Sequence, residues 1–577
     1  MPGQKRYLEG FASGLQAARS GARTPASAAV APPSGPDAAH LAAMARFEAE
    51  GKKLADPEKW KREEHPFDGY ARLRDQASRN EYPKPADNFR WRFYGLFYLA
   101  PNQPFYMARL RMPNGILNWR QLAGIAGIAE TWGAGYAHVT TRANIQIRGI
   151  EAKNATHVVE AVQDLGLTSR GSGADNIRNV TGDATAGIAP DELLDTRPDT
   201  RHWHFHVLND RSLTGLPRKF NVAFDGGGPI PTLEETNDIG FTAVRVAEGA
   251  SVAPAIWYRL ALGGITGHRN LARPTDVVVP PHDSTKVADA VVRVFIDHGD
   301  RTNRARARLK YLIDAWGPEK FLAAVEEKLG RKLDRVEERH ILPRPAQDRM
   351  AHIGFHAQKQ PGLFYAGIPL PVGRLEPAQM RALAEAAHEL GDGDLRLTVW
   401  QNLLVSGIAE TNRRTFEQRM AAAGLPLAVS PLRAGLVACT GSSGCKLANA
   451  RTKEMAVAIA EHCEPRVALD TPINVHLTGC PNSCAQHYVG DIGLVGARVA
   501  TGKDETVDGY HVVIGGSYGS DARVGREFTR GIAAVDMPRF IERLLTAYLA
   551  HRAGPEETFR QFASRHDDET LHRLVGV

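Results

Sequence analysis

Four of the five cysteines in the chain lie in two short segments near its C-terminal end. Five residues separate Cys439 from Cys445, three separate Cys480 from Cys484, and residues 446–479 lie between the two pairs. Four thiolates can bind zinc or an iron–sulfur cluster. Structural zinc sites favour two to four residues between paired ligands, so the wider first gap favours a [4Fe–4S] cluster and leaves zinc as the alternative.

The residues between these cysteines are mostly small. The segments read CTGSSGC and TGCPNSC, so backbone N–H groups could approach the sulfides of a cluster closely. A helix that starts just after Cys445 would add the positive end of its dipole. We interpret the fifth cysteine, Cys463, as a small buried hydrophobic residue.

The composition argues against several classes of protein, namely secreted disulfide-rich, membrane-spanning and nucleic-acid-binding proteins. Five cysteines in 577 residues do not form a disulfide framework, which favours the reducing cytoplasm. No secretory signal and no membrane-spanning apolar run is present. The net charge of +6 comes without the basic repeats that are typical of nucleic-acid binding. Because no G-x-G-x-x-G loop follows a strand-like run, we expect electrons to come from another protein.

An internal repeat organises the elements that must position the cysteines. Residues 105–167 and 364–425 both read as strand, turn, helix, strand, helix. The similarity continues beyond each copy, where NVTG corresponds to ACTG and FNVAF to INVHL. The landmarks that keep their offset are Phe105 with Phe364, Gly149 with Gly407, and Gly166 with Gly424.

The repeat contains a strand-like run with one polar face. In VTTRANIQIRG, alternation places Arg142, Asn144, Gln146 and Arg148 on one side. The residue pattern alone allows two interpretations, a sheet face in water or a polar ligand lying on that face.

Several motifs together resemble the siroheme-containing nitrite and sulfite reductases from about Phe93 to the C-terminus. They are the two cysteine segments with MARLRMPNG, TTRANIQIRG, GADNIRNVTGD, PRKFNV and RARARLKYL. The resemblance implies that Cys439, Cys445, Cys480 and Cys484 bind a [4Fe–4S] cluster. It also implies that Cys484 is the axial ligand of a siroheme.

The resemblance further implies two groups of contacts. Siroheme carries eight carboxylates, which suit cations and amides. The expected siroheme contacts are Arg142, Asn144, Gln146, Arg148 and Asn482. On the open side of the iron, the residues expected to bind the substrate anion and support catalysis are Arg109, Arg178, Lys219 and Asn221.

The resemblance also favours nitrite over sulfite. Sulfite enzymes of the family resemble K-x-K where this chain has Lys219-Phe220-Asn221, and the loop SRGSGADNIR lacks cysteine. We therefore expect six-electron reduction of nitrite to ammonium. The alternatives are sulfite reduction to sulfide and a zinc-binding structural or nucleic-acid module. The expected donor is reduced ferredoxin or flavodoxin, with EKWKREEHP among its candidate contacts.

The expected architecture is α+β, with duplicated ferredoxin-like half-domains related by a pseudo-twofold axis and two α/β cofactor-binding domains. We expect a cytoplasmic monomer. The predicted segments are a flexible N-terminus (1–45), an extension (46–89), half-domains (90–167 and 350–427), a siroheme and substrate domain (168–345), and a cluster domain (428–577).

Overall fold

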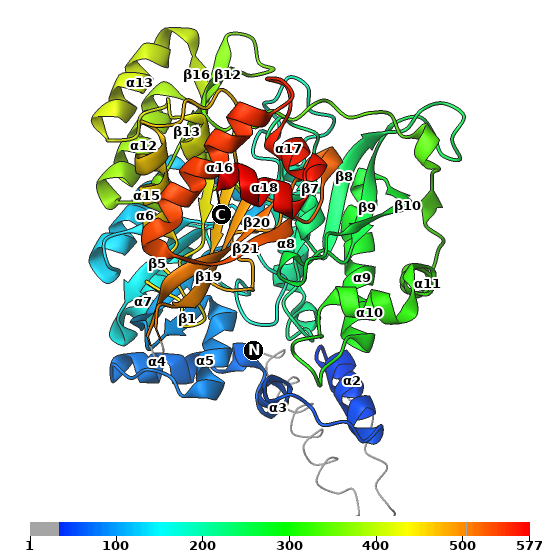
Figure 1. Ribbon diagram of the computed structural model, residues 1–577. Helices are drawn as coiled ribbons and strands as arrows, with labels where there is room; N and C mark the ends of the chain where they lie inside the picture. The colour runs from blue at the N-terminus through cyan, green and yellow to red at the C-terminus, as the bar shows by residue number, and fades with distance from the viewer. Residues whose placement is uncertain (1–33, 503–504, 577) are drawn as a thin grey trace, which may run out of the picture.

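The computed structural model describes residues 34–502 and 505–576. Four β-sheets, each accompanied by helices, make up the molecule (Figure 1). This mixture of mainly antiparallel sheets and helices confirms the predicted α+β class. No helix in the described ranges is long and apolar enough to cross a membrane.

Two five-stranded sheets contain the internal repeat, and each takes one strand from the other copy. In the first sheet the order is β1 (Leu96–Leu99), β2 (Gln103–Arg109), β5 (Ile145–Ile150), β4 (Ala137–Val139) and β14 (Arg374–Leu375). In the second sheet the order is β12 (Gly354–Ala357), β13 (Leu363–Ile368), β16 (Leu403–Ala409), β15 (Asp394–Leu397) and β3 (Ile116–Asn118). Because β14 pairs with β4 and β3 with β15, neither half-domain completes its sheet alone.

The central helices of the two copies begin in the same way and pack on each other. A capping box of Asn118 and Gln121 starts α6 (Trp119–Trp132), and a box of Glu376 and Gln379 starts α12 (Pro377–Leu390). Each box satisfies backbone N–H groups that have no partner within the helix. The two helices contact each other and contribute to one hydrophobic core, so the half-domains form a single unit. The outer helices are α7 (Ala155–Asp164) and α13 (Arg413–Ala422).

Gly149 and Gly407 occupy corresponding positions in the two copies, and both positions require glycine. Gly149 and Gly407 have φ angles of +71° and +74°, a region that L side chains rarely adopt. A Cβ atom would lie 2.4 Å from Ala134 Cβ at the first position and 2.5 Å from Asp392 Cβ at the second. A side chain is therefore excluded at both positions by backbone conformation and by space.

The prediction of one continuous strand over VTTRANIQIRG was wrong. Strand β4 ends at Val139, a tight turn follows, and β5 begins at Ile145. The turn closes with Ala143 at φ +47° and with a bond from Thr140 Oγ1 to Asn144 Oδ1 at 2.5 Å. Arg142 therefore projects from a turn, whereas Gln146 and Arg148 lie on β5.

The other two sheets share a strand pattern, which confirms that the duplication extends beyond the half-domains. In each, two parallel pairings are followed by an antiparallel one. The six-stranded sheet contains β6 (Thr181–Gly182), β7 (Val222–Asp225), β8 (Ile239–Arg245), β9 (Ile256–Leu262), β10 (Arg273–Val279) and β11 (Asp334–Arg335). The five-stranded sheet contains β17 (Leu436–Ala438), β18 (Val475–Thr478), β19 (Ile492–Ala500), β20 (Thr506–Ile514) and β21 (Arg526–Ala533).

A matched hydrogen bond lies at the start of the second parallel pair of strands in both sheets. The backbone N–H of Asn221 donates to Asp238 Oδ2 at 2.8 Å, and that of Asn474 donates to Asp491 Oδ2 at 2.8 Å. Separate helices cover each sheet. For the first sheet they are α8 (Arg197–Asn209), α9 (Ser284–His298), α10 (Leu309–Trp316) and α11 (Pro318–Leu329). For the second they are α14 (Pro431–Ala434), α15 (Lys453–Cys463), α16 (Met537–His551), α17 (Phe559–Arg565) and α18 (Asp568–Val575).

The N-terminal extension is more ordered than the sequence predicted. It contains α2 (Ala38–Ala49), α3 (Asp56–Glu63), α4 (Tyr70–Ser78) and α5 (Pro85–Trp91), drawn in blue along the lower side of Figure 1. The predicted flexible segment 1–45 was wrong from residue 38 onward, because α2 packs on α9 with His40, Ala43 and Met44 buried. Residues 1–33 lie outside the described residues.

Candidate functional site

The cysteine loops follow two neighbouring parallel strands. Cys439 comes directly after β17, while Cys480 and Cys484 follow β18. Because the carboxyl ends of parallel strands meet at one edge of a sheet, the pairing brings the two loops together. The Cys480 side chain is buried, those of Cys439 and Cys445 are half-buried, and Cys484 is exposed. Cys463 is buried in the core of the domain, as the sequence predicted.

The Cys439 sulfur is held in a polar setting that suits a thiolate. The backbone N–H groups of Gly441 and Gly479 donate to its Sγ at 3.4 and 3.2 Å, and Thr452 Oγ1 lies 3.8 Å away. Burial nevertheless raises the pKa of this thiol to about 11, so a bound metal would have to displace its proton. The helix expected just after Cys445 was misplaced, because α15 begins at Lys453 with Thr452 as its N-cap residue.

The cysteine sulfurs can be compared with the spacing that a single zinc ion requires. Four thiolates on one zinc would lie about 3.8 Å apart, because each Zn–S bond is about 2.3 Å long. Within the described ranges, the only three potential ligands among His, Cys, Asp and Glu whose ligand atoms all meet within 4.8 Å are His206, Asp210 and Asp289. The cysteine sulfurs do not form such a group among the described residues.

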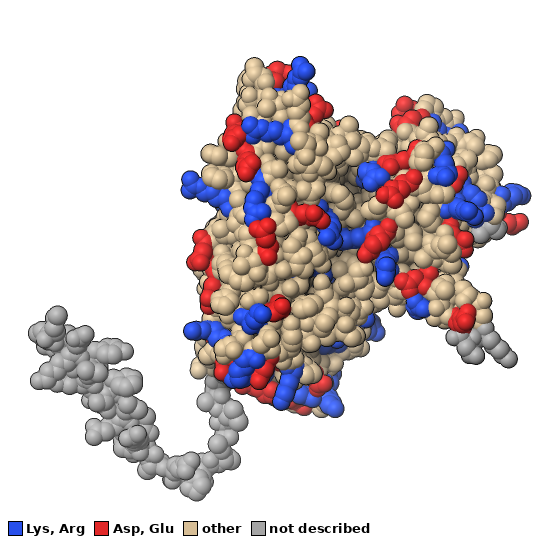
Figure 2. Space-filling model, turned by 90° about the vertical axis from the view of Figure 1, so that its left-hand side faces the viewer, with Lys and Arg blue, Asp and Glu red and all other residues tan. Residues whose placement is uncertain are grey.

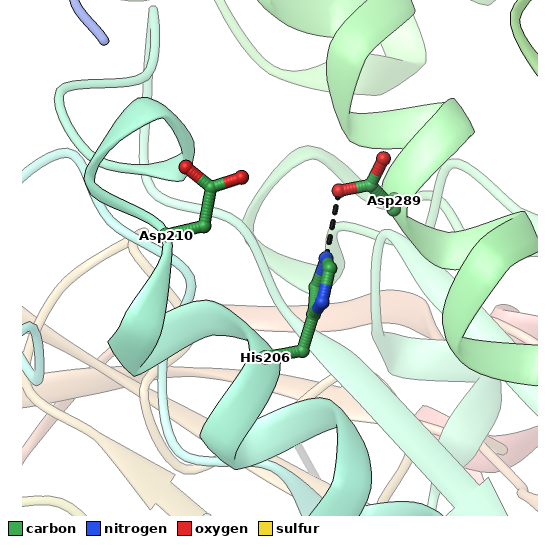
Figure 3. Close-up of side chains that lie close together, drawn as sticks. All are labelled: His206, Asp210 and Asp289. Carbon is green, nitrogen blue, oxygen red and sulfur yellow. Dashed lines mark hydrogen bonds and ion pairs between the residues drawn. The ribbon is translucent and has the colours of Figure 1, made fainter.

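The group of His206, Asp210 and Asp289 is an ion-pair network (Figure 3). His206 Nε2 lies 2.8 Å from Asp289 Oδ1. Arg293 donates to Asp289 at 2.6 Å and to Asp210 at 2.8 Å. A guanidinium that bridges both carboxylates supplies the positive charge that a metal would otherwise bring.

Cationic side chains surround Cys484. Burial lowers the pKa values of Arg109 and Arg142 to about 10 and that of Lys219 well below its usual value. Neighbouring cations lower these pKa values further, whereas the charge of Cys484 raises all three. Arg178 shows the same pKa lowering from burial and from its neighbours Arg109 and Arg142. Three cations, Arg109, Arg142 and Lys219, therefore interact with the charge of this thiol, and Arg178 lies beside the first two.

Two of these cations have no protein partner. Among the described residues, neither the Arg109 nor the Lys219 side chain forms a hydrogen bond or an ion pair, although the Arg109 guanidinium lies 4.4 Å from the Phe97 ring centroid. Arg178 donates only to the carbonyl oxygens of Ser172 and Ala174, at 3.1 and 2.7 Å. Positive charge that the protein leaves uncompensated in a half-buried site fits an anionic ligand.

Asn221 lies between two guanidinium groups, one of which the sequence did not identify. With its amide oxygen turned toward them, Oδ1 accepts from Arg142 Nη2 at 3.0 Å and from Arg308 Nη2 at 3.2 Å. Asp238 in turn accepts from Arg308 Nη2 at 2.6 Å, and Asn237 accepts from Arg142 Nη1 at 3.0 Å. Arg308 belongs to the RARARLKYL motif, but nothing in the sequence separated it from the other arginines there.

The remaining predicted contacts differ in role. Asn144 uses both ends of its amide inside the protein, accepting from Thr140 and donating to Leu110 O at 2.8 Å. Gln146 accepts from Arg148, which also donates to Thr440 beside Cys439. Asn482 donates to the Cys480 sulfur at 3.5 Å. Asn144 therefore shapes the turn, whereas Arg148 and Asn482 contact the cysteine loops.

Comparisons with known proteins identify the family of the chain. A family model described as the nitrite and sulphite reductase 4Fe-4S domain matches residues 173–333 and 433–573. A second, the nitrite/sulfite reductase ferredoxin-like half domain, matches residues 100–165 and 356–423. The repeat found in the sequence thus corresponds to two copies of each family domain.

Individual relatives cover most of the chain. The ferredoxin–nitrite reductase of Synechococcus elongatus is 35% identical over 517 residues, which is 87% of this chain and 98% of the relative. The chloroplastic ferredoxin–nitrite reductase of Zea mays is 34% identical, over 82% of this chain and 84% of the relative. The solved structure of the NirA protein of Mycobacterium tuberculosis superposes with a TM-score of 0.83 at 28% identity, covering 90% of this chain and 98% of that chain. The chain therefore belongs to the nitrite and sulfite reductase family.

Proposed function

We propose that the protein reduces nitrite to ammonium with electrons from reduced ferredoxin. The observation that carries this proposal is the group of uncompensated cations near Cys484, a thiol close enough to Cys439 and Cys480 to influence the pKa of each. The printed names of the relatives, ferredoxin–nitrite reductase, support the choice of substrate and donor. In balanced form, one nitrite, six electrons and eight protons give one ammonium and two waters.

The cysteines and the polar residues around them suit two anionic cofactors. Cys439, Cys445, Cys480 and Cys484 would hold a [4Fe–4S] cluster, and Cys484 would also hold a siroheme. Arg142, Arg148, Gln146 and Asn482 would contact siroheme carboxylates or the cluster loops. When bound, the two cofactors would store electrons and deliver them singly to the substrate nitrogen.

The pocket residues would bind the anion and assist its protonation. Arg109, Arg178 and Lys219 present positive charge in a half-buried site, where electrostatic attraction is stronger than in water. As each N–O bond breaks, the departing oxygen gains negative charge, which these cations would stabilise. Because burial and crowding lower the pKa of Lys219, its ammonium would give up a proton more readily than an exposed lysine would.

The neutral side chain of Asn221 supports nitrite as the substrate in preference to sulfite. Its neutral amide lies between Arg142 and Arg308 and is 2% exposed. A lysine at this position would add a charge that suits the sulfite dianion better than the nitrite monoanion. The test is steady-state reduction of both anions with a ferredoxin or viologen donor. A higher kcat/KM for nitrite is expected, and a markedly higher kcat/KM for sulfite would replace the proposal by its alternative.

A serine variant tests the proposed role of Cys484. Cys484→Ser should lose siroheme absorption or the electronic coupling between siroheme and cluster, and nitrite turnover with it. Cys463→Ala is the matched control, because Cys463 lies in a separate hydrophobic cluster and its Sγ is 3.7 Å from Pro538 O. Native spectra and full turnover in Cys484→Ser would refute the bridging role.

The proposal also includes a cytoplasmic monomer supplied by reduced ferredoxin or flavodoxin. The low cysteine content and the absence of any disulfide among the described residues agree with a reducing compartment. Sedimentation of the purified holoenzyme would measure its oligomeric state directly, with a single species near 62.9 kDa expected.

A further inference from the structure

Lys61 is a buried cation in the N-terminal extension, outside the site described above. It lies on α3 and is 7% exposed. Its Nζ donates to Glu58 Oε1 at 2.6 Å and to the carbonyl oxygens of Gly215 and Leu216 at 3.2 and 2.8 Å. It also lies 3.4 Å from Asp175 Oδ2. The sequence predicts EKWKREEHP as one candidate contact for the electron donor. Within it, Glu58 and Lys61 are too buried to contact a donor protein.

The groups that Lys61 contacts belong to the two segments that carry pocket cations. Asp175 lies three residues before Arg178, and Leu216 lies three residues before Lys219. The two segments are joined to each other by backbone hydrogen bonds. Leu216 N donates to Asp175 O at 2.9 Å, and Arg178 N donates to Phe220 O at 2.8 Å. Lys61 thus binds both segments from the side of the extension.

Each carboxylate in this network also has a second cationic partner besides Lys61. Asp175 is fully buried and also accepts two hydrogen bonds from Arg304, both at 2.8 Å. Burial alone would raise the pKa of the Asp175 carboxyl, but Lys61 and Arg304 outweigh burial and hold the pKa at about 2. Glu58 is paired separately with Arg301 at 2.6 Å. If Lys61 were removed, both carboxylates would therefore still have a cationic partner.

An apolar contact from the extension reaches the same loop. Ala174 adopts a left-handed conformation, with φ +49°, and its carbonyl accepts from Arg178 Nη2 at 2.7 Å. Trp60, the neighbour of Lys61, packs in one hydrophobic cluster with Phe89, Phe93 and Ala174. A strained non-glycine residue persists only where its surroundings hold it in place. Here part of the support comes from α3.

We propose that α3 positions the anion pocket, with Lys61 acting as a positioning residue that fixes the segments carrying Arg178 and Lys219. This inference rests on the proposed function for its kinetic test, although the geometry is independent of it. Without Lys61, the two segments would keep their mutual hydrogen bonds but lose the cation that binds both. The anion-binding conformation of the pocket would then be less populated.

The test compares Lys61→Met with two controls in the holoenzyme, using a reduced viologen donor so that ferredoxin docking does not enter. Lys59→Met removes a cation from the same helix that pairs only with Asp56. Arg211→Gln breaks ion pairs that join Asp37 and Asp68 of the extension to the same domain at its surface. We expect Lys61→Met to raise the KM for nitrite at least fivefold with kcat changed less than twofold, and both controls to match the wild type.

Hydrogen–deuterium exchange gives a readout that does not depend on activity. The amides of Arg178 and Leu216 should exchange at least fivefold faster in Lys61→Met and at wild-type rates in both controls. Lys61→Arg, which keeps the charge, should restore most of the protection. Unchanged KM and exchange in Lys61→Met, or equal changes in Arg211→Gln, would overturn the inference.

A second variant covers the case in which Lys61→Met does not fold. Trp60→Leu reduces the packing of the hydrophobic cluster that contains Ala174 without removing a buried charge, and it should raise the KM and the exchange rate of the same amides. Wild-type behaviour in this variant would contradict the inference. If the wild-type enzyme failed to reduce nitrite, the proposed function would fall, while the exchange rates would still decide the role of Lys61.

Discussion

Arg148 on β5 donates a hydrogen bond to the hydroxyl of Thr440 at 2.5 Å, which joins the first half-domain to the loop that follows Cys439. The same guanidinium contacts His138 Nδ1 at 3.0 Å and Gln146 Oε1 at 2.9 Å, and Arg148 is 3% exposed. Burial lowers the pKa of Arg148, and the charges of Cys445 and Cys439 raise it. A single buried side chain therefore couples a half-domain sheet to the cysteine loops.

Arg148→Met should weaken the cluster site. The variant loses four side-chain hydrogen bonds and a positive charge beside the thiolates, and we expect a destabilisation of about 2 kcal/mol. Iron and labile sulfide content should fall at least twofold in protein purified in parallel. The control is Arg120→Met, because Arg120 is exposed on α6 and contacts only the Trp119 ring. Full cluster content in Arg148→Met would show that the hydrogen bond between Arg148 and Thr440 is not needed for cluster binding.

Asn221→Lys should shift substrate preference toward sulfite. The added ammonium would lie beside Arg142 and Arg308, where a dianion gains more from it than a monoanion does. We expect the ratio of kcat/KM for nitrite to kcat/KM for sulfite to fall at least tenfold, or about 1.4 kcal/mol. Asn221→Ala serves as the control, since it removes the amide without adding charge. An unchanged ratio in Asn221→Lys would show that residue 221 does not determine whether nitrite or sulfite is preferred.

The sequence predicted which residues lie near the cysteines better than it predicted the contacts that hold them. The cysteine spacing and the repeat were visible because they are local patterns. The exchange of β3 and β14 was not, because strand pairing across more than two hundred residues leaves no local signature. The burial of Lys61 could not be predicted, because burial of a cation depends on partners supplied by distant segments, here residues 175 and 215–216.

Glu235 should make stability depend on pH. Burial raises the pKa of its carboxyl from 4.5 to about 7, although the Gly519 N–H donates to Oε1 at 3.2 Å. Because the folded pKa is raised, this group's contribution is complete below pH 4.5 and lost as pH rises to about 7. The loss amounts to roughly 3 kcal/mol.

Denaturant unfolding across this pH range measures the effect. Glu235→Gln mimics the protonated carboxyl, so the stability of the wild type relative to this variant should fall between pH 4.5 and 7 and then level off. Glu417→Gln on the exposed side of α13 is the control. A constant difference between wild type and Glu235→Gln at every pH would mean that Glu235 titrates normally.

Donor binding should depend on salt. The net charge is +6, although Lys and Arg alternate with Asp and Glu on the face drawn in Figure 2. At limiting ferredoxin, turnover should fall as ionic strength rises from about 0.01 to 0.15 M, over which the Debye length shrinks from about 30 to 8 Å. The same titration with saturating viologen is the control and should be much flatter. A flat profile with ferredoxin would exclude electrostatic steering of the donor.

The central claim is tested most directly by the stoichiometry of the reaction. Purified holoenzyme is given a known amount of nitrite with excess reduced viologen under anaerobic conditions, and viologen oxidation and ammonium are both counted. The proposed function predicts six electrons consumed and one ammonium formed for each nitrite. Fewer electrons with a partly reduced nitrogen product, or no consumption of nitrite at all, would contradict it.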